Sequence, residues 1–295
     1  MNNDWTEISV NTTTIVGELI SEFLLEEGAK GIVLGEWQPN DVSEYTIVKA
    51  YLPEEFNIED ISQKIQGKLN FYAESGLNVG AREILVKTVK EDDWSDSWKK
   101  YFHVTRIGKH LVIKPLWEDY QAQKEDLVIN FDPGMAFGTG THPSTHLCIE
   151  KIEEIFTNNN SDYNTLDLGT GSGVLAITMD LLGVKKITAI DIDPVSVRTA
   201  KENFELNKMN INLFQGQLKD CTEKYDFIAG NLLAQIIESI AEDLPQYLNS
   251  KGLFMGAGII NHKEEDVINA LTKHGLILKD KKYQGDWVLV LFEKP

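Results

Sequence analysis

A glycine-rich segment at residues 167–173, Asp-Leu-Gly-Thr-Gly-Ser-Gly, restricts the fold of this chain more than any other part of it. Its first two residues close a short strand-like stretch at 165–168, and its last residue opens a helix-like stretch at 173–182. Glycines at such a turn remove side chains where a ligand must touch the backbone, and they leave the N–H groups at the start of the helix accessible. The segment therefore predicts a strand–turn–helix unit that holds a nucleotide-like cofactor.

The pattern after residue 165 predicts a doubly wound α/β sheet, because short apolar stretches alternate with helix-like ones. Expected strands lie at 165–168, 186–191, 211–214, 225–229 and 252–256, and expected helices at 173–182, 194–207, 233–244 and 263–274. Two closing strands at 276–283 and 287–292 are joined by only three residues, so this last pair should be antiparallel. The sheet should thus be mostly parallel, with an antiparallel last hairpin.

The first ninety residues predict a separate, smaller α+β domain. Expected strands lie at 5–10, 31–36, 45–52 and 82–89, and residues 15–24 and 58–69 place apolar side chains at helical spacing. The resulting order, βαββαβ, is that of the ferredoxin-like split motif. Trp94 and Trp98 lie four residues apart, which favours a linker helix at 91–103 pinned by the two rings; an aromatic wall near a substrate is the alternative. We expect domains at 1–90 and 104–295.

The charge of the chain argues against direct nucleic-acid binding. Its net charge is −18, and residues 1–90 hold 15 acidic and 7 basic side chains. Such a surface repels a phosphate backbone and attracts a basic partner, although it could also serve solubility alone. No secretion signal or membrane span is apparent, and Cys148 and Cys221 have neither metal-binding nor redox spacing. We therefore expect a cytoplasmic protein with no metal site.

Two carboxylates near the turn narrow the choice of cofactor. Asp167 ends the first strand, where a negative charge suits the cationic amino-acid portion of S-adenosyl-L-methionine and disfavours a pyrophosphate. Asp191 ends the next strand, where an acid accepts hydrogen bonds from ribose hydroxyls. Asp193 precedes a proline and is expected to be a helix cap. The pattern thus favours a methyl donor.

The glycine spacing weighs against the main rival, a nicotinamide-dependent dehydrogenase. That class carries the fingerprint Gly-x-Gly-x-x-Gly. Here Gly169, Gly171 and Gly173 are evenly spaced, so the third glycine comes one residue early. The closing strand pair also disfavours a dehydrogenase.

Residues 130–145 are expected to contain no regular element, because they hold three glycines and two prolines. A loop of this length just before the cofactor sheet is typical of a lid or binding loop.

Several motifs together resemble one known family. They are Phe131-Asp-Pro-Gly134, Phe137-Gly-Thr-Gly-Thr-His-Pro143, residues 167–173, Asp191-Ile-Asp193 and Asn231-Leu-Leu233. Over nearly its whole length the chain resembles the bacterial ribosomal protein L-eleven methyltransferase family. The second of these motifs is highly specific to that family and its near relatives, whereas the glycine turn alone indicates only class I methyltransferases.

The resemblance implies a class I methyltransferase fold and a protein substrate. Family members transfer methyl groups from S-adenosyl-L-methionine to lysine side chains and to the N-terminal amine of the basic ribosomal protein L-eleven. The domain at 1–90 would recognise that substrate, and the linker would let the two domains reorient. The family's cofactor contacts fall on Thr145, Gly169, Asp191 and Asn231. The chain departs from the family pattern at Thr170, where cysteine is common, at Ser144, where threonine is common, and at Gly230, where alanine is common.

Asn231 is the candidate catalytic residue. Its amide oxygen, with a nearby backbone carbonyl, could accept hydrogen bonds from the amine and aim the lone pair at the methyl group. The alternative is a turn or a helix cap. Phe137 and Thr139 would belong to a cover over the methyl group, with simple loop packing as the alternative for Phe137. His142 is expected to be structural, and no histidine–carboxylate pair is apparent as a base.

Three other functions remain as alternatives. One is a methyltransferase that acts on another protein lysine or on a small amine, and another is a non-catalytic S-adenosylmethionine-binding protein. The third, a nucleic-acid methyltransferase, is disfavoured by the acidic first domain.

Overall fold

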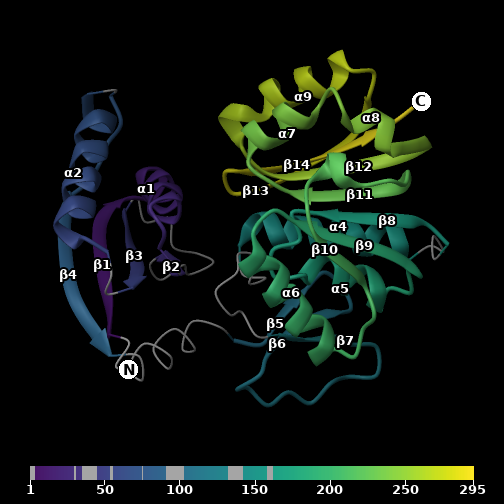
Figure 1. The fold of residues 1–295 in the computed structure, drawn as a ribbon, viewed down its shortest axis with the longest axis horizontal. Helices are drawn as coiled ribbons and strands as arrows, with labels where there is room; N and C mark the ends of the chain where they lie inside the picture. The colour runs from purple at the N-terminus through teal and green to yellow at the C-terminus, as the bar shows by residue number, and fades with distance from the viewer. Residues whose placement is uncertain are drawn as a thin grey trace. The chain divides into compact units, whose positions relative to one another are not determined.

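The computed structural model describes residues 4–29, 31–34, 45–53, 56–74, 76–90, 103–131, 142–157 and 162–295. The chain divides into two compact units, Met1–Phe102 and His103–Pro295 (Figure 1). The linker helix expected at 91–103, with Trp94 and Trp98, lies outside the described residues except for His103.

The first unit is an antiparallel four-stranded sheet with two helices. Its elements are β1 Asp4–Thr13, α1 Thr14–Glu26, β2 Gly31–Leu34, β3 Tyr45–Pro53, α2 Ile58–Glu74 and β4 Glu83–Lys90. The strand order is β2-β3-β1-β4, and every neighbouring pair is antiparallel. Ile8 and Val48 on the strands are fully buried with Ile20 of α1 and Ile65 of α2 in one core. The ferredoxin-like arrangement predicted from the sequence is confirmed.

The second unit is built on a seven-stranded sheet with the order β10-β9-β8-β11-β12-β14-β13. The strands are β8 Asn164–Leu168, β9 Lys186–Asp191, β10 Asn212–Gln215, β11 Tyr225–Asn231, β12 Leu248–Ile260, β13 Ile277–Gln284 and β14 Trp287–Glu293. Neighbouring strands from β10 to β12 are parallel, and β14 runs antiparallel to both β12 and β13. The predicted mostly parallel sheet with an antiparallel last hairpin is therefore confirmed.

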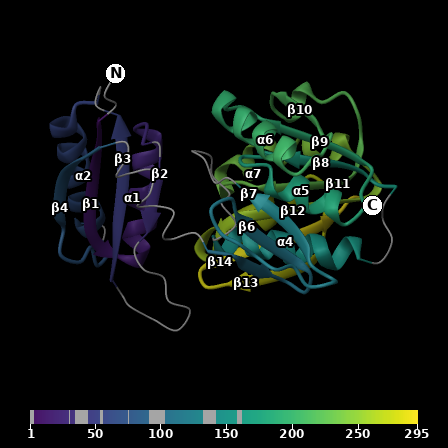
Figure 2. The same ribbon diagram turned by 90° about the horizontal axis from the view of Figure 1, so that it is seen from below.

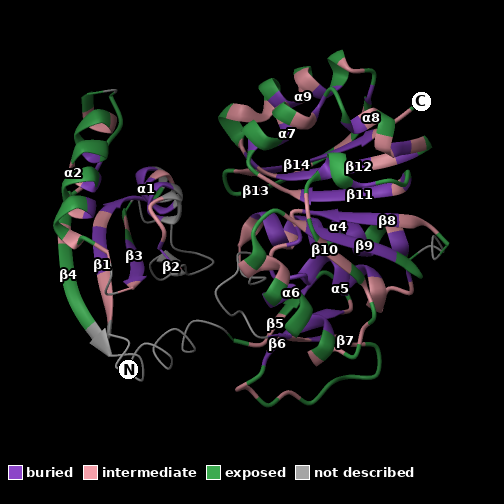
Figure 3. Cartoon of the chain, viewed as in Figure 1, coloured by how far each residue is buried: buried purple, intermediate pink, exposed green. Residues whose placement is uncertain are grey.

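Helices cover both faces of this sheet (Figures 1 and 2). One core contains α4 Pro143–Phe156, α5 Val174–Leu181 and α6 Pro194–Leu206, and the other contains α7 Ala234–Ile240, α8 Leu244–Tyr247 and α9 Glu264–Lys273. Successive strand residues point to opposite faces, so in β11 Phe227 joins the first core and Ile228 the second. Figure 3 shows the buried central strands and the exposed outer sides of the helices.

A small sheet of three strands packs into the first of these cores. It consists of β5 Thr105–Ile107, β6 Leu111–Pro115 and β7 Leu127–Phe131, in that order. β5 and β6 are antiparallel, whereas β6 and β7 are parallel. Apolar residues at 110–115 and 127–131 indicate strands in the sequence itself, close to β6 and β7. β5 is not indicated, because three residues are too few to show alternation.

Two expectations about regular structure are wrong. Residues 130–145 are not irregular throughout, since β7 extends to Phe131 and α4 begins at Pro143, where proline is tolerated in a first helical turn. The single helix expected at 233–244 is two helices, α7 and α8. Pro245 has no N–H to donate to the carbonyl of Ala241, so the first helix ends before it.

Candidate active site

Three segments singled out by the sequence meet at the carboxyl edge of the parallel strands: the turn after β8, the end of β9 and the end of β11. β8 lies between β9 and β11 in the sheet, so their carboxyl ends are neighbours. The N–H groups of Gly169 and Thr170 both donate to the carbonyl of Ile190, at 2.9 Å each, which ties the turn to β9. Ligands of such sheets bind at this edge.

The turn itself depends on its glycines. Gly169, Gly171 and Gly173 have φ values of +73°, +54° and +86°, in the left-handed region that disfavours side chains. A Cβ atom on Gly169 would lie 2.5 Å from Cδ2 of Leu232, and one on Gly173 would lie 2.5 Å from Cε1 of Phe204. The positive φ favours glycine at both positions, and at Gly173 the buried Phe204 ring also leaves little room for a side chain.

Asp167 is fully buried, and one of its two carboxylate oxygens has no hydrogen-bond partner among the described residues. Its Oδ2 accepts hydrogen bonds from the Thr170 hydroxyl at 2.7 Å and from the Ala176 N–H at 3.1 Å. Its Oδ1 has no hydrogen-bond partner among the described residues. Burial raises the pKa of Asp167 to about 7; the two donors oppose this shift and the charge of Asp191 adds to it. An oxygen of this kind is suited to a ligand that brings positive charge.

Asp191 lies at the end of β9 and contacts the turn directly. Its Oδ2 accepts a hydrogen bond from the Gly171 N–H at 2.9 Å, and its Oδ1 accepts one from the Asp193 N–H at 2.9 Å. Burial raises its pKa, and these backbone donors limit the rise. Asp193 caps α6 by accepting a hydrogen bond from the Val195 N–H at 2.9 Å, as the sequence predicts. A carboxylate has further lone pairs, so Asp191 can still accept ligand hydroxyls.

Asn231 ends β11, and α4 brings Thr145 to its side chain. The Asn231 Nδ2 group donates to the Thr145 hydroxyl oxygen at 3.3 Å, although the two residues are 86 positions apart. The Asn231 Oδ1 atom is buried and lacks a hydrogen-bond partner within the described part of the chain. The end of β11 therefore holds a buried amide oxygen whose capacity to accept a hydrogen bond is unused within the described part of the chain.

The start of α4 is set by His142. Its Nδ1 accepts a hydrogen bond from the Ser144 N–H at 3.2 Å, and its ring meets that of Trp287 edge-on at 4.5 Å between centroids. Burial lowers the pKa of His142 to about 4, so the ring is neutral near pH 7. His142 thus has the structural role expected of it. Phe137 and Thr139, the expected cover, lie outside the described residues.

Sequence reasoning missed three residues that complete the site. Thr170, first noted only as a departure from the family pattern, supplies a hydrogen bond to Asp167. Ile192 follows Asp191, and its side chain is 69% exposed. Gly258 of β12 has a φ of +78°, and a Cβ atom there would lie 2.6 Å from the Leu232 carbonyl oxygen and 3.1 Å from Asn231 Oδ1. The sequence signal for Ile192 is its place between two acids; Gly258 has none.

Two histidine–carboxylate pairs occur among the described residues, and neither was singled out by the sequence. His103 Nδ1 lies 2.7 Å from Glu118, and His110 Nδ1 lies 2.9 Å from Glu153. Within the described part, neither pair shares a hydrogen bond with Asn231. Each pair joins residues that are distant along the chain, 15 positions apart in the first and 43 in the second.

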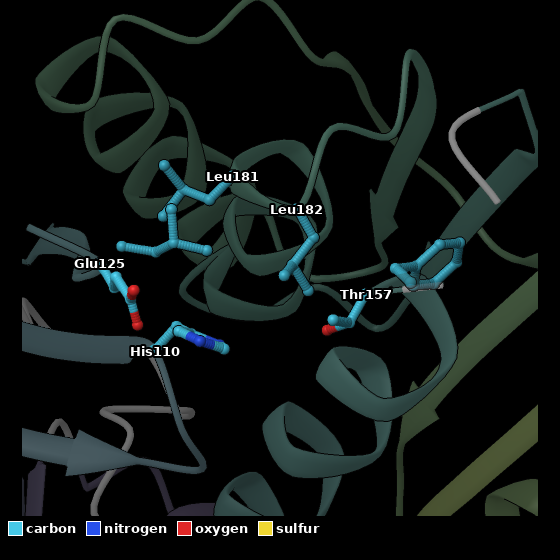
Figure 4. A pocket seen from close by; sticks show the side chains of 7 residues that line it. His110, Glu125, Thr157, Leu181 and Leu182 are labelled. Carbon is cyan, nitrogen blue, oxygen red and sulfur yellow. The ribbon is translucent and has the colours of Figure 1, made fainter. Parts of the chain in front are cut away.

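A hollow of about 340 Å³ lies away from these residues (Figure 4). It is lined by His110, Glu125, Leu127, Phe156, Thr157, Leu181 and Leu182, which include the last residues of α4 and α5. Those helix ends lie at the opposite edge of the sheet from the glycine turn. We assign this hollow no part in the chemistry.

Among the described residues, no group of three or more His, Cys, Asp or Glu side chains could hold a metal ion. None of the helices described is both long and apolar enough to cross a bilayer.

Comparison with known proteins identifies close relatives. Residues 4–295 match the family described as Ribosomal protein L11 methyltransferase (PrmA). The chain is 37% identical over 310 residues to the ribosomal protein L11 methyltransferase of Alkaliphilus oremlandii, with 97% of each chain covered. It is 37% identical over 313 residues to that of Enterococcus faecalis, covering 99% of this chain and 98% of the relative. The crystal structure of ribosomal protein L11 methylase from Lactobacillus delbrueckii subsp. bulgaricus matches with a TM-score of 0.61 and 34% identity, over 66% of this chain and 100% of that one.

Proposed function

The chain belongs to the ribosomal protein L11 methyltransferase family, and on this premise we propose that it transfers methyl groups from S-adenosylmethionine to amines of ribosomal protein L11. The acceptors are lysine side chains and the N-terminal amine. One observation carries this proposal: two buried oxygens, Asp167 Oδ1 and Asn231 Oδ1, have no partner among the described residues at the carboxyl edge of the sheet. The first suits an ammonium group and the second suits the hydrogens of an amine.

The residues around the turn fit S-adenosylmethionine. Asp167 would hold the ammonium group of its methionine portion, and Asp191 would accept hydrogen bonds from its ribose. The exposed side chain of Ile192 would pack on the flat adenine ring. The glycine backbone at Gly169 and Gly171 would allow the ligand to approach closely.

Asn231 would orient the acceptor amine. When bound, S-adenosylmethionine supplies a methyl group on a positively charged sulfur. The acceptor must be neutral to attack; a lysine has a reference pKa near ~10.4, which burial beside a positive charge lowers. The Asn231 oxygen accepts a hydrogen from the amine and thereby directs its lone pair, so that proximity and orientation supply most of the rate gain.

The first unit would recognise the protein substrate. We place this substrate-recognition domain at residues 1–90, with a linker at 91–103 and the methyltransferase domain at 104–295. The excess of acidic side chains in residues 1–90 supports an encounter with a basic protein. Because its acceptor is a ribosomal protein, we propose that the enzyme works in the cytoplasm.

Intact-mass spectrometry tests the function. Purified full-length enzyme is incubated with ribosomal protein L11 and S-adenosylmethionine, and the substrate should gain mass in multiples of one methyl group. The Asn231→Ala variant is the control and should lose most of this activity while it stays folded. Absence of any mass gain, in a preparation that binds the donor by calorimetry, would exclude L11 as the substrate. Absence of donor binding would exclude the cofactor as well.

A further inference from the structure

The Asn231 amide is enclosed from two sides by residues of other elements. On one side, its Nδ2 group donates to the hydroxyl oxygen of Thr145 at 3.3 Å. On the other side, the backbone of Gly258 is so near that a Cβ atom would lie 3.1 Å from Asn231 Oδ1. The amide is therefore held at its nitrogen end, and its oxygen end remains without a partner among the described residues.

Thr145 is itself rigidly placed. It is fully buried, and it lies in the first turn of α4. Its N–H donates to the carbonyl of His142 at 3.0 Å, and the His142 side chain caps the same helix end. This buried hydroxyl lies on a capped helical turn and accepts a hydrogen bond from Asn231 Nδ2, and that bond restricts the rotation of the Asn231 amide.

We propose that Thr145 is a positioning residue that acts through Asn231, holding its amide so that the oxygen faces the acceptor amine. This proposal rests on the proposed function, because it assumes that Asn231 orients that amine. It differs from the role that the family resemblance assigns to Thr145, which is a contact with the methyl donor. The Thr145 hydroxyl oxygen accepts the Asn231 hydrogen and keeps its own proton to donate, so both roles are chemically available and kinetics must separate them.

The two roles predict different kinetic effects. A donor contact would change the dissociation constant of S-adenosylmethionine, whereas a positioning residue would change kcat and leave that constant alone. Misplacing a reacting group by about 1 Å can cost roughly a hundredfold in rate. We expect a loss of about tenfold to a hundredfold in kcat when the Thr145 hydroxyl is removed.

The test uses three single variants of the full-length enzyme, together with a double variant that is compared with Asn231→Ala. Thr145→Val keeps the shape but removes the acceptor, and Thr145→Ser keeps the hydroxyl. Thr165→Val is the matched control, because Thr165 is also fully buried, but its hydroxyl donates to the Lys186 carbonyl at 3.0 Å at the other end of β8. For each variant, kcat, donor affinity by calorimetry and Tm are measured.

Thr145→Val should have a lower kcat than the natural enzyme and the same affinity for S-adenosylmethionine. Thr145→Ser should retain most of the natural kcat, and Thr165→Val should retain all of it. Adding Thr145→Val to Asn231→Ala should cause no further loss, because both act on one group. Weakened donor binding with normal kcat would overturn the proposal, as would a full additional loss in the double variant.

A second readout does not depend on turnover. In protein labelled with ¹⁵N-asparagine, the signal of the Asn231 side-chain amide is identified by its loss in Asn231→Ala. It should shift and exchange faster with solvent in Thr145→Val than in Thr145→Ser. An unchanged signal would overturn the positioning role even if L11 proved not to be the substrate, and a changed signal would support it in that case.

Discussion

At the scale of single residues, the site contains two buried oxygens, Asp167 Oδ1 and Asn231 Oδ1, that have no hydrogen-bond partner among the described residues. Asp167 is placed in the interior with one oxygen bound by Thr170 and Ala176 and the other without a partner among the described residues. Burying a charge in this way destabilises the folded chain unless a ligand compensates it. A bound donor that compensates this charge would therefore stabilise the folded chain.

The Asp167→Asn variant should be more stable than the natural chain at alkaline pH. Burial raises the pKa of Asp167 from 3.8 to about 7, so the folded chain binds this proton more tightly than the unfolded chain does. Its contribution to stability is therefore present at low pH and is lost as the pH rises towards 7. Asparagine does not titrate, so the advantage of the variant in free energy of unfolding should grow by about 2 kcal/mol between pH 5.5 and pH 8.

Urea unfolding of the ligand-free proteins at both pH values measures this difference. The same variant should bind S-adenosylmethionine about tenfold to a hundredfold more weakly, since it loses a buried charged hydrogen bond. An advantage that is equal at pH 5.5 and pH 8 would contradict the assignment of the titrating group.

Leu232 packs closely against two glycines, Gly169 in the turn after β8 and Gly258 in β12. A Cβ atom built on Gly169 would lie 2.5 Å from the Leu232 side chain, and one built on Gly258 would lie 2.6 Å from the Leu232 carbonyl oxygen. Two glycines from different elements thus make room for the residue that follows Asn231.

Gly258→Ala should lower both stability and kcat. The new methyl group would push against the Leu232 carbonyl and the Asn231 amide, and the φ of +78° adds about 1–2 kcal/mol of backbone strain. Gly275→Ala is the matched control, because its φ is +88° but no atom lies within 4 Å of the new methyl group. Both variants should lose stability in thermal unfolding, but only Gly258→Ala should lose turnover; a comparable loss of turnover in both would point to strain alone.

At the scale of elements, the caps of α4 and α6 orient the helices that carry site residues. α4 begins at the His142 cap and presents Thr145, and α6 begins at the Asp193 cap next to Asp191. Because each cap adjoins a site residue, fraying of either helix end would disturb the site directly.

Asp193→Ala should lower the free energy of unfolding by about 1 kcal/mol, because the Val195 N–H would lose its acceptor. Asp243→Ala removes an acid at the start of α8 that makes no such capping bond, and it should cost much less. Urea denaturation of both variants measures the difference. Equal losses would mean that charge, and not the cap, sets the effect.

The ends of helices and strands show which element boundaries can be predicted from sequence patterns alone. The strands from β8 to β11 and the helices α5 and α6 follow the predicted ranges closely, because periodicity and caps are local signals. β5 is too short to carry a pattern, and the break between α7 and α8 depends on how Pro245 limits the preceding turn.

At the scale of the whole molecule, charge is the dominant feature. The net charge is −18, and residues 1–90 contribute an excess of acidic side chains. Charge of one sign speeds the encounter with a partner of the opposite sign, and salt screens this effect.

The kcat/KM for ribosomal protein L11 should therefore fall severalfold between about 50 and about 300 mM salt, where screening becomes effective over a few ångströms. The affinity for S-adenosylmethionine should change little, because its main contacts are local, and it serves as the control. Steady-state kinetics and calorimetry at the same salt concentrations give both values. A kcat/KM that is independent of salt would indicate that the acidic surface serves solubility only.

The sequence by itself determined the fold class, the glycine turn, the two carboxylates and the candidate acceptor amide, since each is encoded by residues that are neighbours along the chain. The tertiary structure alone decided what those groups contact. It placed Thr145 against Asn231 across 86 residues, packed Leu232 between two glycines and buried Asp167 deeply enough to raise its pKa to about 7. Local patterns dictate backbone conformation, whereas burial and long-range contacts arise only when the elements pack together.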